Sequence, residues 1–262
     1  MYIITFIAFF ISSIALADLQ VFPLRVLLSE KDRHTQISVR HRGKKPMKYR
    51  ITTVFYKMNA DGTVKPLEKK QITEKSADSL FRFSPKQVLL EPNIEQVIRV
   101  VLRAPAELPV GEYRTHLHFE GLDDPNEKTA GQEKTSDAQM LLKARMAVAI
   151  PVIVRKGSPT LKVTLSNLKY VKTQDQKPAF SVDMKREGNS IPFGTFEVLS
   201  IAAGKEPKVV GVVNGVSSYI DFRNVTFPLL EAPLVPGKFK VIFKKPTIDG
   251  GEEMSSAETE LK

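Results

Sequence analysis

The stretch that decides the fold runs from Asp137 to Gly157 and reads D-A-Q-M-L-L-K-A-R-M-A-V-A-I-P-V-I-V-R-K-G. Apolar side chains recur in it at every second position, which is the period of a β-strand, and these positions are Met140, Leu142, Ala144, Met146, Val148 and Ile150. A helical period would scatter Lys143 and Arg145 among the apolar residues, and Pro151 would break such a helix. The stretch therefore predicts a long β-strand.

This predicted strand is longer than one small sheet needs, because strands usually have about 5 to 6 residues. Its second half, residues 150–154, does not alternate, which predicts a segment buried on both faces. Its first half, residues 140–148, alternates and could leave large apolar side chains without a partner inside their own domain. We therefore expect the two halves to have different roles. The alternative is that all these side chains fill the core of their own domain.

The length and the composition favour two all-β domains. A chain of 262 residues is natural for two domains of about 100 to 130 residues, although one larger domain is the alternative. No stretch shows sustained helical periodicity, and glycine and proline separate many short alternating segments. The pattern restarts after residues 156–159 with seven strand-like segments, at 161–165, 179–184, 193–201, 209–213, 219–225, 238–243 and 254–261.

A short motif predicts that both domains are sandwiches of one kind. Tyr113 opens an alternating segment after the proline-rich corner 104–111, which matches the tyrosine corner of immunoglobulin-like sandwiches. Residues 235–241 of the second half repeat this corner and the start of the strand that follows it. A long, charged loop is expected between the Tyr113 strand and the long strand, at residues 121–138.

The N-terminal residues predict export. Residues 2–16 form an uncharged apolar run that ends at Ala15-Leu16-Ala17, a small-x-small cleavage pattern, so we expect residues 1–17 to be a signal peptide. A short N-terminal anchor is the alternative, but the run is shorter than the roughly 20 residues that span a bilayer.

Composition also argues against several functions. The chain has no cysteine, which excludes disulfides, Cys-ligated zinc and thiol catalysis. Its net charge of +10 is spread along nearly every predicted strand, without a groove-entering helix or a basic aromatic platform, so no nucleic acid is expected. No catalytic or nucleotide-binding motif occurs, so we expect no enzyme, no cofactor and no small-molecule substrate. His116 and His118 share a strand face but lack a third ligand at a suitable spacing, so we expect solvated histidines and no metal.

Four motifs, in this order and spacing, carry a resemblance to a known family. They are the early segment Arg25-Val26-Leu27-Leu28, then Phe83-Ser84-Pro85-Lys86-Gln87-Val88, then Leu108-Pro109-Val110-Gly111-Glu112-Tyr113-Arg114, and the strand end Ile150-Pro151-Val152-Ile153-Val154-Arg155. Together they resemble the PapD-like periplasmic pilus chaperones. The resemblance implies a boomerang of two immunoglobulin-like sandwiches, at residues 18–156 and 157–262, in the periplasm.

The same resemblance implies a function. Such a chaperone stabilises secreted pilus or fimbrial subunits and delivers them to an outer-membrane usher, and it lends its long strand to a subunit that lacks a strand of its own. Met140, Leu142, Ala144, Met146 and Val148 would then bind the subunit. The alternative from another class is an extracytoplasmic immunoglobulin-like module that binds a surface polymer or a receptor and assembles nothing.

The resemblance also implies roles for charged residues. Arg25 matches the arginine that holds the subunit's C-terminal carboxylate, whereas Pro151 stands where the family has a second cation, a lysine. Lys143, Arg145 and Arg155 are the residues that could compensate. Glu112 and Arg155 match charges that fix the angle between the two domains, with no partner in the second domain identifiable from the sequence.

Overall fold

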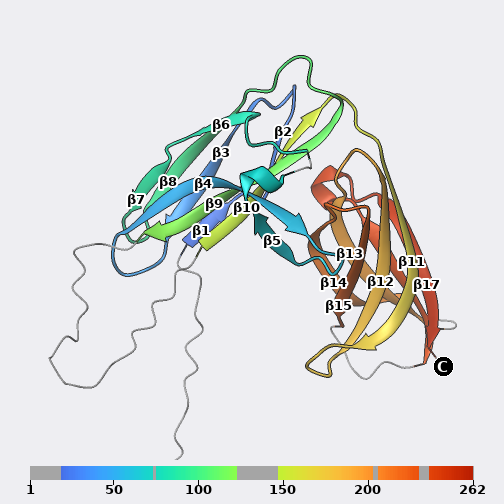
Figure 1. Cartoon of the computed structure of the whole chain (residues 1–262). Helices are drawn as coiled ribbons and strands as arrows, with labels where there is room; N and C mark the ends of the chain where they lie inside the picture. The colour runs from blue at the N-terminus through green and yellow to red at the C-terminus, as the bar shows by residue number, and fades with distance from the viewer. Residues whose placement is uncertain (1–18, 73–74, 123–146, 203–205, 230–235, 262) are drawn as a thin grey trace, which may run out of the picture.

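The computed structural model describes residues 19–72, 75–122, 147–202, 206–229 and 236–261. The expected signal peptide, most of the expected loop, and Met140, Leu142, Ala144 and Met146 lie outside the described residues. The described chain is all-β and folds into two β-sandwiches that meet at an angle (Figure 1), as the sequence predicted. No described helix is long and apolar enough to cross a membrane.

The N-terminal sandwich packs a four-stranded sheet against a six-stranded sheet. The first has the order β1-β3-β8-β6, with bounds Leu19–Phe22, His34–His41, Glu95–Leu102 and Phe81–Ser84. The second has the order β2-β10-β9-β4-β5, with β7 also paired to β4, and the bounds are Val26–Leu28, Ala147–Lys156, Gly111–Leu122, Met47–Met58, Val64–Leu67 and Gln87–Leu90.

The C-terminal sandwich has a three-stranded and a four-stranded sheet. The first has the order β11-β12-β15, with bounds Leu161–Lys172, Pro178–Gly188 and Phe222–Pro228. The second has the order β14-β13-β16-β17, with bounds Lys208–Ser217, Phe193–Ile201, Gly237–Lys244 and Glu253–Leu261. Short 3₁₀ turns occur at Lys69–Gln71 and Thr247–Asp249.

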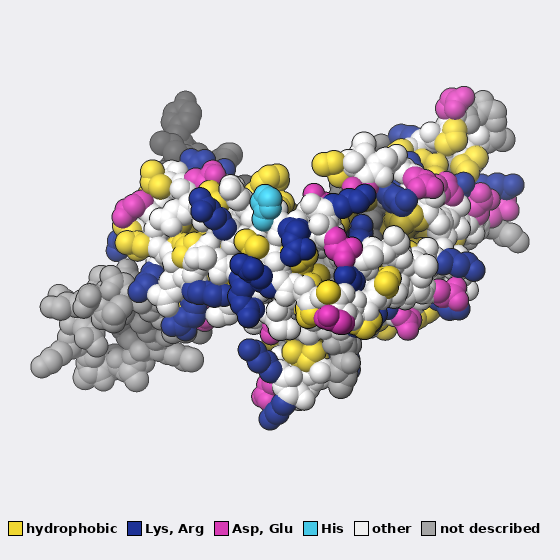
Figure 2. Space-filling model, turned by 90° about the horizontal axis from the view of Figure 1, so that it is seen from above, with side chains coloured by type: hydrophobic (Ala, Val, Ile, Leu, Met, Phe, Trp, Pro, Cys, Tyr) yellow, Lys and Arg dark blue, Asp and Glu magenta, His cyan; other side chains and the backbone are white. Residues whose placement is uncertain are grey.

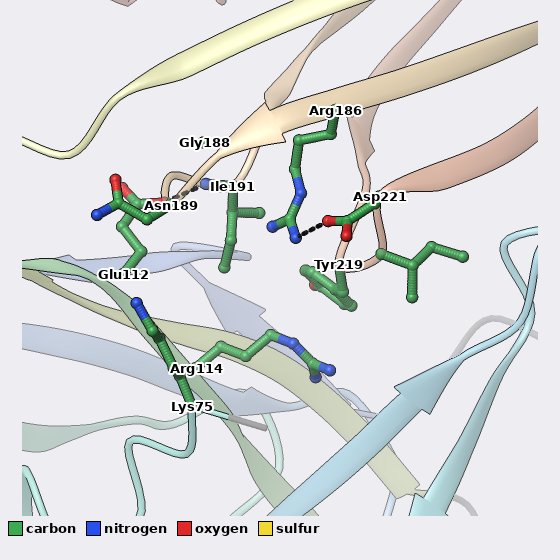
Figure 3. Close-up of a pocket in the computed structure, with 10 residues that line it drawn as sticks. Lys75, Glu112, Arg114, Arg186, Gly188, Asn189, Ile191, Tyr219 and Asp221 are labelled. Carbon is green, nitrogen blue, oxygen red and sulfur yellow. Dashed lines mark hydrogen bonds and ion pairs between the residues drawn. The ribbon is translucent and has the colours of Figure 1, made fainter. Parts of the chain in front are cut away.

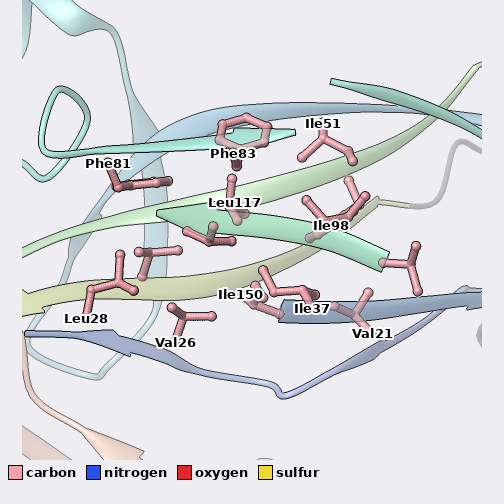
Figure 4. Packing of buried hydrophobic residues seen from close by; sticks show 14 of the residues in the cluster. Val21, Val26, Leu28, Ile37, Ile51, Phe81, Phe83, Ile98, Leu117 and Ile150 are labelled. Atoms are coloured by element: carbon pink, nitrogen blue, oxygen red, sulfur yellow. The ribbon is translucent and has the colours of Figure 1, made fainter. Parts of the chain in front are cut away.

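Each sandwich has its own hydrophobic core, formed by the inward positions of facing sheets. Figure 4 shows Ile37 and Ile98 of one sheet meeting Leu117 and Ile150 of the other in the N-terminal core. In the C-terminal core the ring of Phe196 lies 4.6 Å from that of Phe243, measured between centroids. The two cores share no residue, which is why the chain forms two sandwiches rather than one larger domain.

The second half of the stretch at residues 137–157 is buried as the sequence predicted. Ile150, Val152 and Val154 of β10 join the N-terminal core, and Ile153 is buried between them on the opposite face. Both edges of β10 are also paired at Val152 to Val154, with β9 on one side and β2 on the other.

The tyrosine corner is also confirmed. The Tyr113 hydroxyl donates a hydrogen bond of 2.9 Å to the carbonyl oxygen of Pro109, four residues upstream. The strand that follows begins at Gly111 with φ of 149°, and β16 begins at Gly237 with φ of 154°, so the two halves repeat the same backbone start.

Candidate functional site

Strand β10 has an open edge. Its pairing with β9 runs along its whole length, from Ala147 to Lys156, whereas on the other side β2 pairs only with Val152, Ile153 and Val154. No described strand covers the other side of residues 147–151. The gap exists because β1 pairs with β3 of the opposite sheet, so that the chain changes sheets at residues 23–25 before it reaches β10.

The side chains along this edge alternate as expected. Val148 is half-buried and packs against the N-terminal core, while Ala147 and Ala149 are exposed. The face that carries Val148 therefore points inward at this end of the sheet. The apolar positions that precede it at the same period, Met140 to Met146, lie outside the described residues.

Arg25 lies where this edge meets the junction of the sandwiches. It precedes β2, and its guanidinium lies over the ring of Phe193 in the C-terminal sandwich, 4.4 Å from the ring centroid. Arg25, Pro151 and Phe193 line a cleft of about 780 Å³ between the two sandwiches. Burial lowers the pKa of Arg25, and the charge of Glu112 opposes that shift.

Glu112 and Arg155 form an ion pair at the junction. Nε and Nη2 of Arg155 each lie 2.7 Å from Oε1 of Glu112. The second oxygen of Glu112 accepts a hydrogen bond of 2.5 Å from the backbone N–H of Ile191 in the C-terminal sandwich. The Glu112 side chain is 0% exposed and that of Arg155 is 39% exposed, so the carboxylate is the fully desolvated partner.

A loop of the C-terminal sandwich completes this contact. The backbone N–H of Glu112 donates to the carbonyl oxygen of Asn189 at 2.9 Å, and Nδ2 of Asn189 donates to the carbonyl oxygen of Val110 at 2.9 Å. Sequence reasoning placed Glu112 and Arg155 at the junction but found no partner across it. The two partners of Glu112 across the junction are backbone groups of Asn189 and Ile191, which leave no signal in the residue types.

Arg155 is one of the three residues that could compensate for the lysine that Pro151 displaces. Its guanidinium pairs with Glu112 on β9. The other two candidates, Lys143 and Arg145, lie outside the described residues.

A second cavity, of about 480 Å³, opens beside this ion pair (Figure 3). Lys75, Arg114 and Arg186 line it, and Arg186 pairs with Asp221 at 2.6 Å. Arg114 is 3% exposed because its guanidinium lies over the rings of Phe55 and Tyr219, 4.2 and 4.3 Å from their centroids, and its Nη1 donates to the carbonyl oxygen of Tyr56 at 2.6 Å.

His116 is not a solvated histidine, contrary to the expectation from its strand face. It is 6% exposed, and its ring lies edge-on to Tyr56 and Tyr219, with centroids 4.9 and 5.9 Å away. Burial, with a smaller contribution from Arg114, lowers the pKa of His116 to about 4. His116 is buried because Tyr219 of the C-terminal sandwich covers it, and a single-strand pattern cannot reveal this.

The hairpin between β4 and β5 makes another contact between the sandwiches. The carbonyl oxygen of Ala60 accepts a hydrogen bond of 2.7 Å from the backbone N–H of Asn224 on β15. The sulfur of Met58 lies 3.5 Å from the backbone nitrogen of Tyr219, which donates to it. These contacts close one side of the cleft that holds Arg25, since Met58 and Val64 line it.

Charge is dispersed over the visible surface. Figure 2 shows Lys and Arg side chains on both sandwiches, interspersed with acidic side chains rather than gathered in one stripe. No group of three or more His, Asp or Glu side chains within the described ranges is arranged to hold a metal ion.

Comparisons with known proteins give structural similarity only. No protein-family model and no curated protein matches the sequence. Similar solved structures include a chaperone–tip adhesin complex of CFA/I fimbriae biogenesis, 12% identical over 94% of this chain and 99% of that chain, with a TM-score of 0.47. The complex of the Salmonella enterica SafA pilin with the SafB chaperone is 14% identical over 95% of this chain and 99% of that chain, with a TM-score of 0.44. The E. coli chaperone DraB is 13% identical over 93% of this chain and 98% of that chain, with a TM-score of 0.42.

Many fimbrial chaperones are among these structures, and they are the group that the sequence motifs resemble. Every one of these TM-scores is below 0.5, so the function proposed for this chain rests on its own residues.

Proposed function

We propose that this protein is a periplasmic chaperone that binds secreted pilus or fimbrial subunits by donor-strand complementation and delivers them to an outer-membrane usher. The observation that carries the proposal is the uncovered edge of β10 at residues 147–151, which ends beside Arg25. An uncovered strand edge offers backbone hydrogen bonds to an added strand, and alternate side chains give that strand its specificity.

The direction of the added strand follows from β2. Strand β2 runs parallel to β10 and starts at Val26, opposite Val152. A subunit strand on the edge at residues 147–151 would continue the line of β2 in the direction of its N-terminus. If the subunit strand also runs parallel to β10, its C-terminal end meets Arg25.

Apolar burial and charge would each contribute to binding. Met140, Leu142, Ala144, Met146 and Val148 would fill the groove of a subunit that lacks one strand, and each large side chain buried contributes roughly 1.5 to 3 kcal/mol. Arg25 would hold the subunit's C-terminal carboxylate, because a guanidinium can donate two parallel hydrogen bonds to a carboxylate.

The junction would hold the open edge of β10 and the carboxylate site at Arg25 in a fixed relative position. We place the boundary between the domains at residues 156–157, directly after β10. The Glu112–Arg155 pair and its contact with Ile191 then hold the angle between the sandwiches, and with it the cleft around Arg25. Without that angle the strand edge and the carboxylate site would not face one ligand.

The test is capture of clients by the tagged, mature protein from the periplasm of its source, with the captured proteins identified by mass spectrometry. We expect exported subunits with an incomplete sandwich. Leu142→Glu or Met146→Glu should abolish capture and leave the chaperone folded, whereas Ala149→Glu, on the exposed face of β10, should retain it.

Two outcomes contradict the proposal. Unfolding of both Leu142→Glu and Met146→Glu would show that these residues belong to the protein's own core. Capture of a polysaccharide or of a complete, stable receptor, with no effect of either substitution, would favour the binding module.

A further inference from the structure

Two guanidinium groups face one cleft from opposite sandwiches. Arg25 of the N-terminal sandwich and Arg223 on β15 of the C-terminal sandwich both line the cleft of about 780 Å³. Arg25 lies over the ring of Phe193, and Nη1 of Arg223 donates to the carbonyl oxygen of Ser217. Within the described part of the chain, neither guanidinium forms an ion pair with a carboxylate.

The side chain of Arg223 is held in place by the tip of the β4–β5 hairpin. Gly62 at this tip has φ of 85°, and a Cβ atom there would clash with the guanidinium of Arg223. The guanidinium thus packs directly against the hairpin backbone, which Asn224 anchors through Ala60. Nε of Arg223 is buried and has no hydrogen-bond partner among the described residues, so one oriented donor remains unused.

Two acidic groups near the cleft are already engaged in hydrogen bonds. Glu112 accepts hydrogen bonds from Arg155 and from Ile191, and Asp61 accepts hydrogen bonds from Thr63. Burial is the main influence on both cleft arginines and lowers the pKa of each. The charges of Glu112, Tyr219 and Asp249 oppose this shift at Arg25, and those of Tyr219 and Asp61 oppose it at Arg223. A largely buried positive charge that forms no direct ion pair is costly, and an anionic ligand in contact with it would offset that cost.

We infer that Arg223 is the second cation of the carboxylate site, so that a client's C-terminal carboxylate is held between one arginine from each sandwich. This inference rests on the proposed function and identifies what replaces the lysine that Pro151 displaces. It also makes the site dependent on both sandwiches, because neither alone supplies both guanidinium groups.

The cleft also indicates the kind of C-terminal residue that fits. Leu24 and Ile248 line it from the two sandwiches, and they are 70% and 93% exposed. Large apolar side chains this exposed gain from being covered. The ligand is therefore a peptide C-terminus whose last side chain is apolar and whose carboxylate is free.

The inference is tested with one peptide in two forms. The probe is a synthetic peptide of alternating Val and Thr that ends in Leu, prepared with a free C-terminal carboxylate and as the C-terminal amide, and binding to the mature protein is followed by fluorescence anisotropy. The parent protein should prefer the carboxylate by about tenfold or more. Arg223→Gln should lose most of this preference and bind the amide as the parent does, and Arg223→Lys should retain part of it.

Arg186→Gln is the matched control, because Arg186 lies at the junction but lines the other cavity and pairs with Asp221. It should keep the full preference. If Arg223→Gln keeps the preference while Arg25→Gln loses it, the inference is wrong and the proposed function stands. If Arg223→Gln is unfolded, the result for Arg223→Lys decides. An unchanged preference for the carboxylate in Arg223→Lys, together with equal binding of the carboxylate and amide peptides by Arg25→Gln, would also overturn the inference. A parent protein that binds neither peptide contradicts the proposed function and this inference together.

Discussion

Removing the cation from the junction ion pair should destabilise the protein more than removing the anion. Glu112 is 0% exposed, so Arg155→Gln leaves a desolvated carboxylate with the Ile191 N–H as its remaining donor from across the junction. Removing one partner of a buried ion pair costs about 3 to 5 kcal/mol. We expect about 3 kcal/mol for Arg155→Gln, because the Ile191 N–H still donates a hydrogen bond to the Glu112 carboxylate. Arg155 is 39% exposed, so water can hydrate its guanidinium when glutamine replaces Glu112. Glu112→Gln should therefore cost only about 1 to 2 kcal/mol.

The assay is urea denaturation of the mature protein, which gives the free energy of unfolding of each single variant and of the double variant. The double variant should be more stable than Arg155→Gln alone, because no buried charge remains. Glu30→Gln is the matched control, since it breaks the surface pair with Lys156 at 2.6 Å and should change little. The reasoning is refuted if Arg155→Gln is no less stable than Glu112→Gln, or if Glu30→Gln costs as much as either.

Three further predictions follow from the same structure. The pKa of His116 is about 4 in the folded state and about 6.5 when unfolded, so the unfolded chain takes up the proton first and stability falls as the pH drops from 6.5 to 4. In His116→Gln, the fall in the free energy of unfolding over this pH range should be smaller by roughly 3 kcal/mol, as measured by denaturation at a series of pH values. If the free energy of unfolding of His116→Gln depends on pH as steeply as that of the parent, the burial argument is contradicted. Tyr113→Phe should lower the free energy of unfolding by about 1 kcal/mol, because it removes the hydrogen bond to Pro109, and a variant as stable as the parent would contradict that role. Limited proteolysis should cut near residues 156–159 or within 121–138, and first cuts inside the described strands would contradict the two-domain arrangement.

Local patterns were enough to predict the fold. Alternation at a period of two, together with glycine and proline turns, located segments such as β13, whose observed bounds, Phe193–Ile201, match the expected ones. The Tyr113 corner was predictable for the same reason, because its hydrogen bond joins residues only four positions apart.

Contacts between the sandwiches could not be predicted in the same way. Ile191 binds Glu112 through its backbone N–H, 79 positions away, so its side-chain type carries no information about the contact. His116 was expected in solvent because Tyr219, which covers it, belongs to the other sandwich. Arg155 pairs with Glu112 across two neighbouring strands, and spacing along one strand does not reveal such a partner.

The most direct test of strand addition is amide hydrogen exchange along β10, compared between the free protein and the protein bound to a captured client. We predict that amides of residues 147–150 facing away from β9 exchange quickly in the free protein and slowly in the complex, because a client strand would cover their edge. Pro151 has no amide hydrogen and does not contribute to the signal. Val152 to Val154 already pair with β2 and should change little. A bound client that leaves the exchange of residues 147–150 unchanged would contradict donor-strand complementation at this edge.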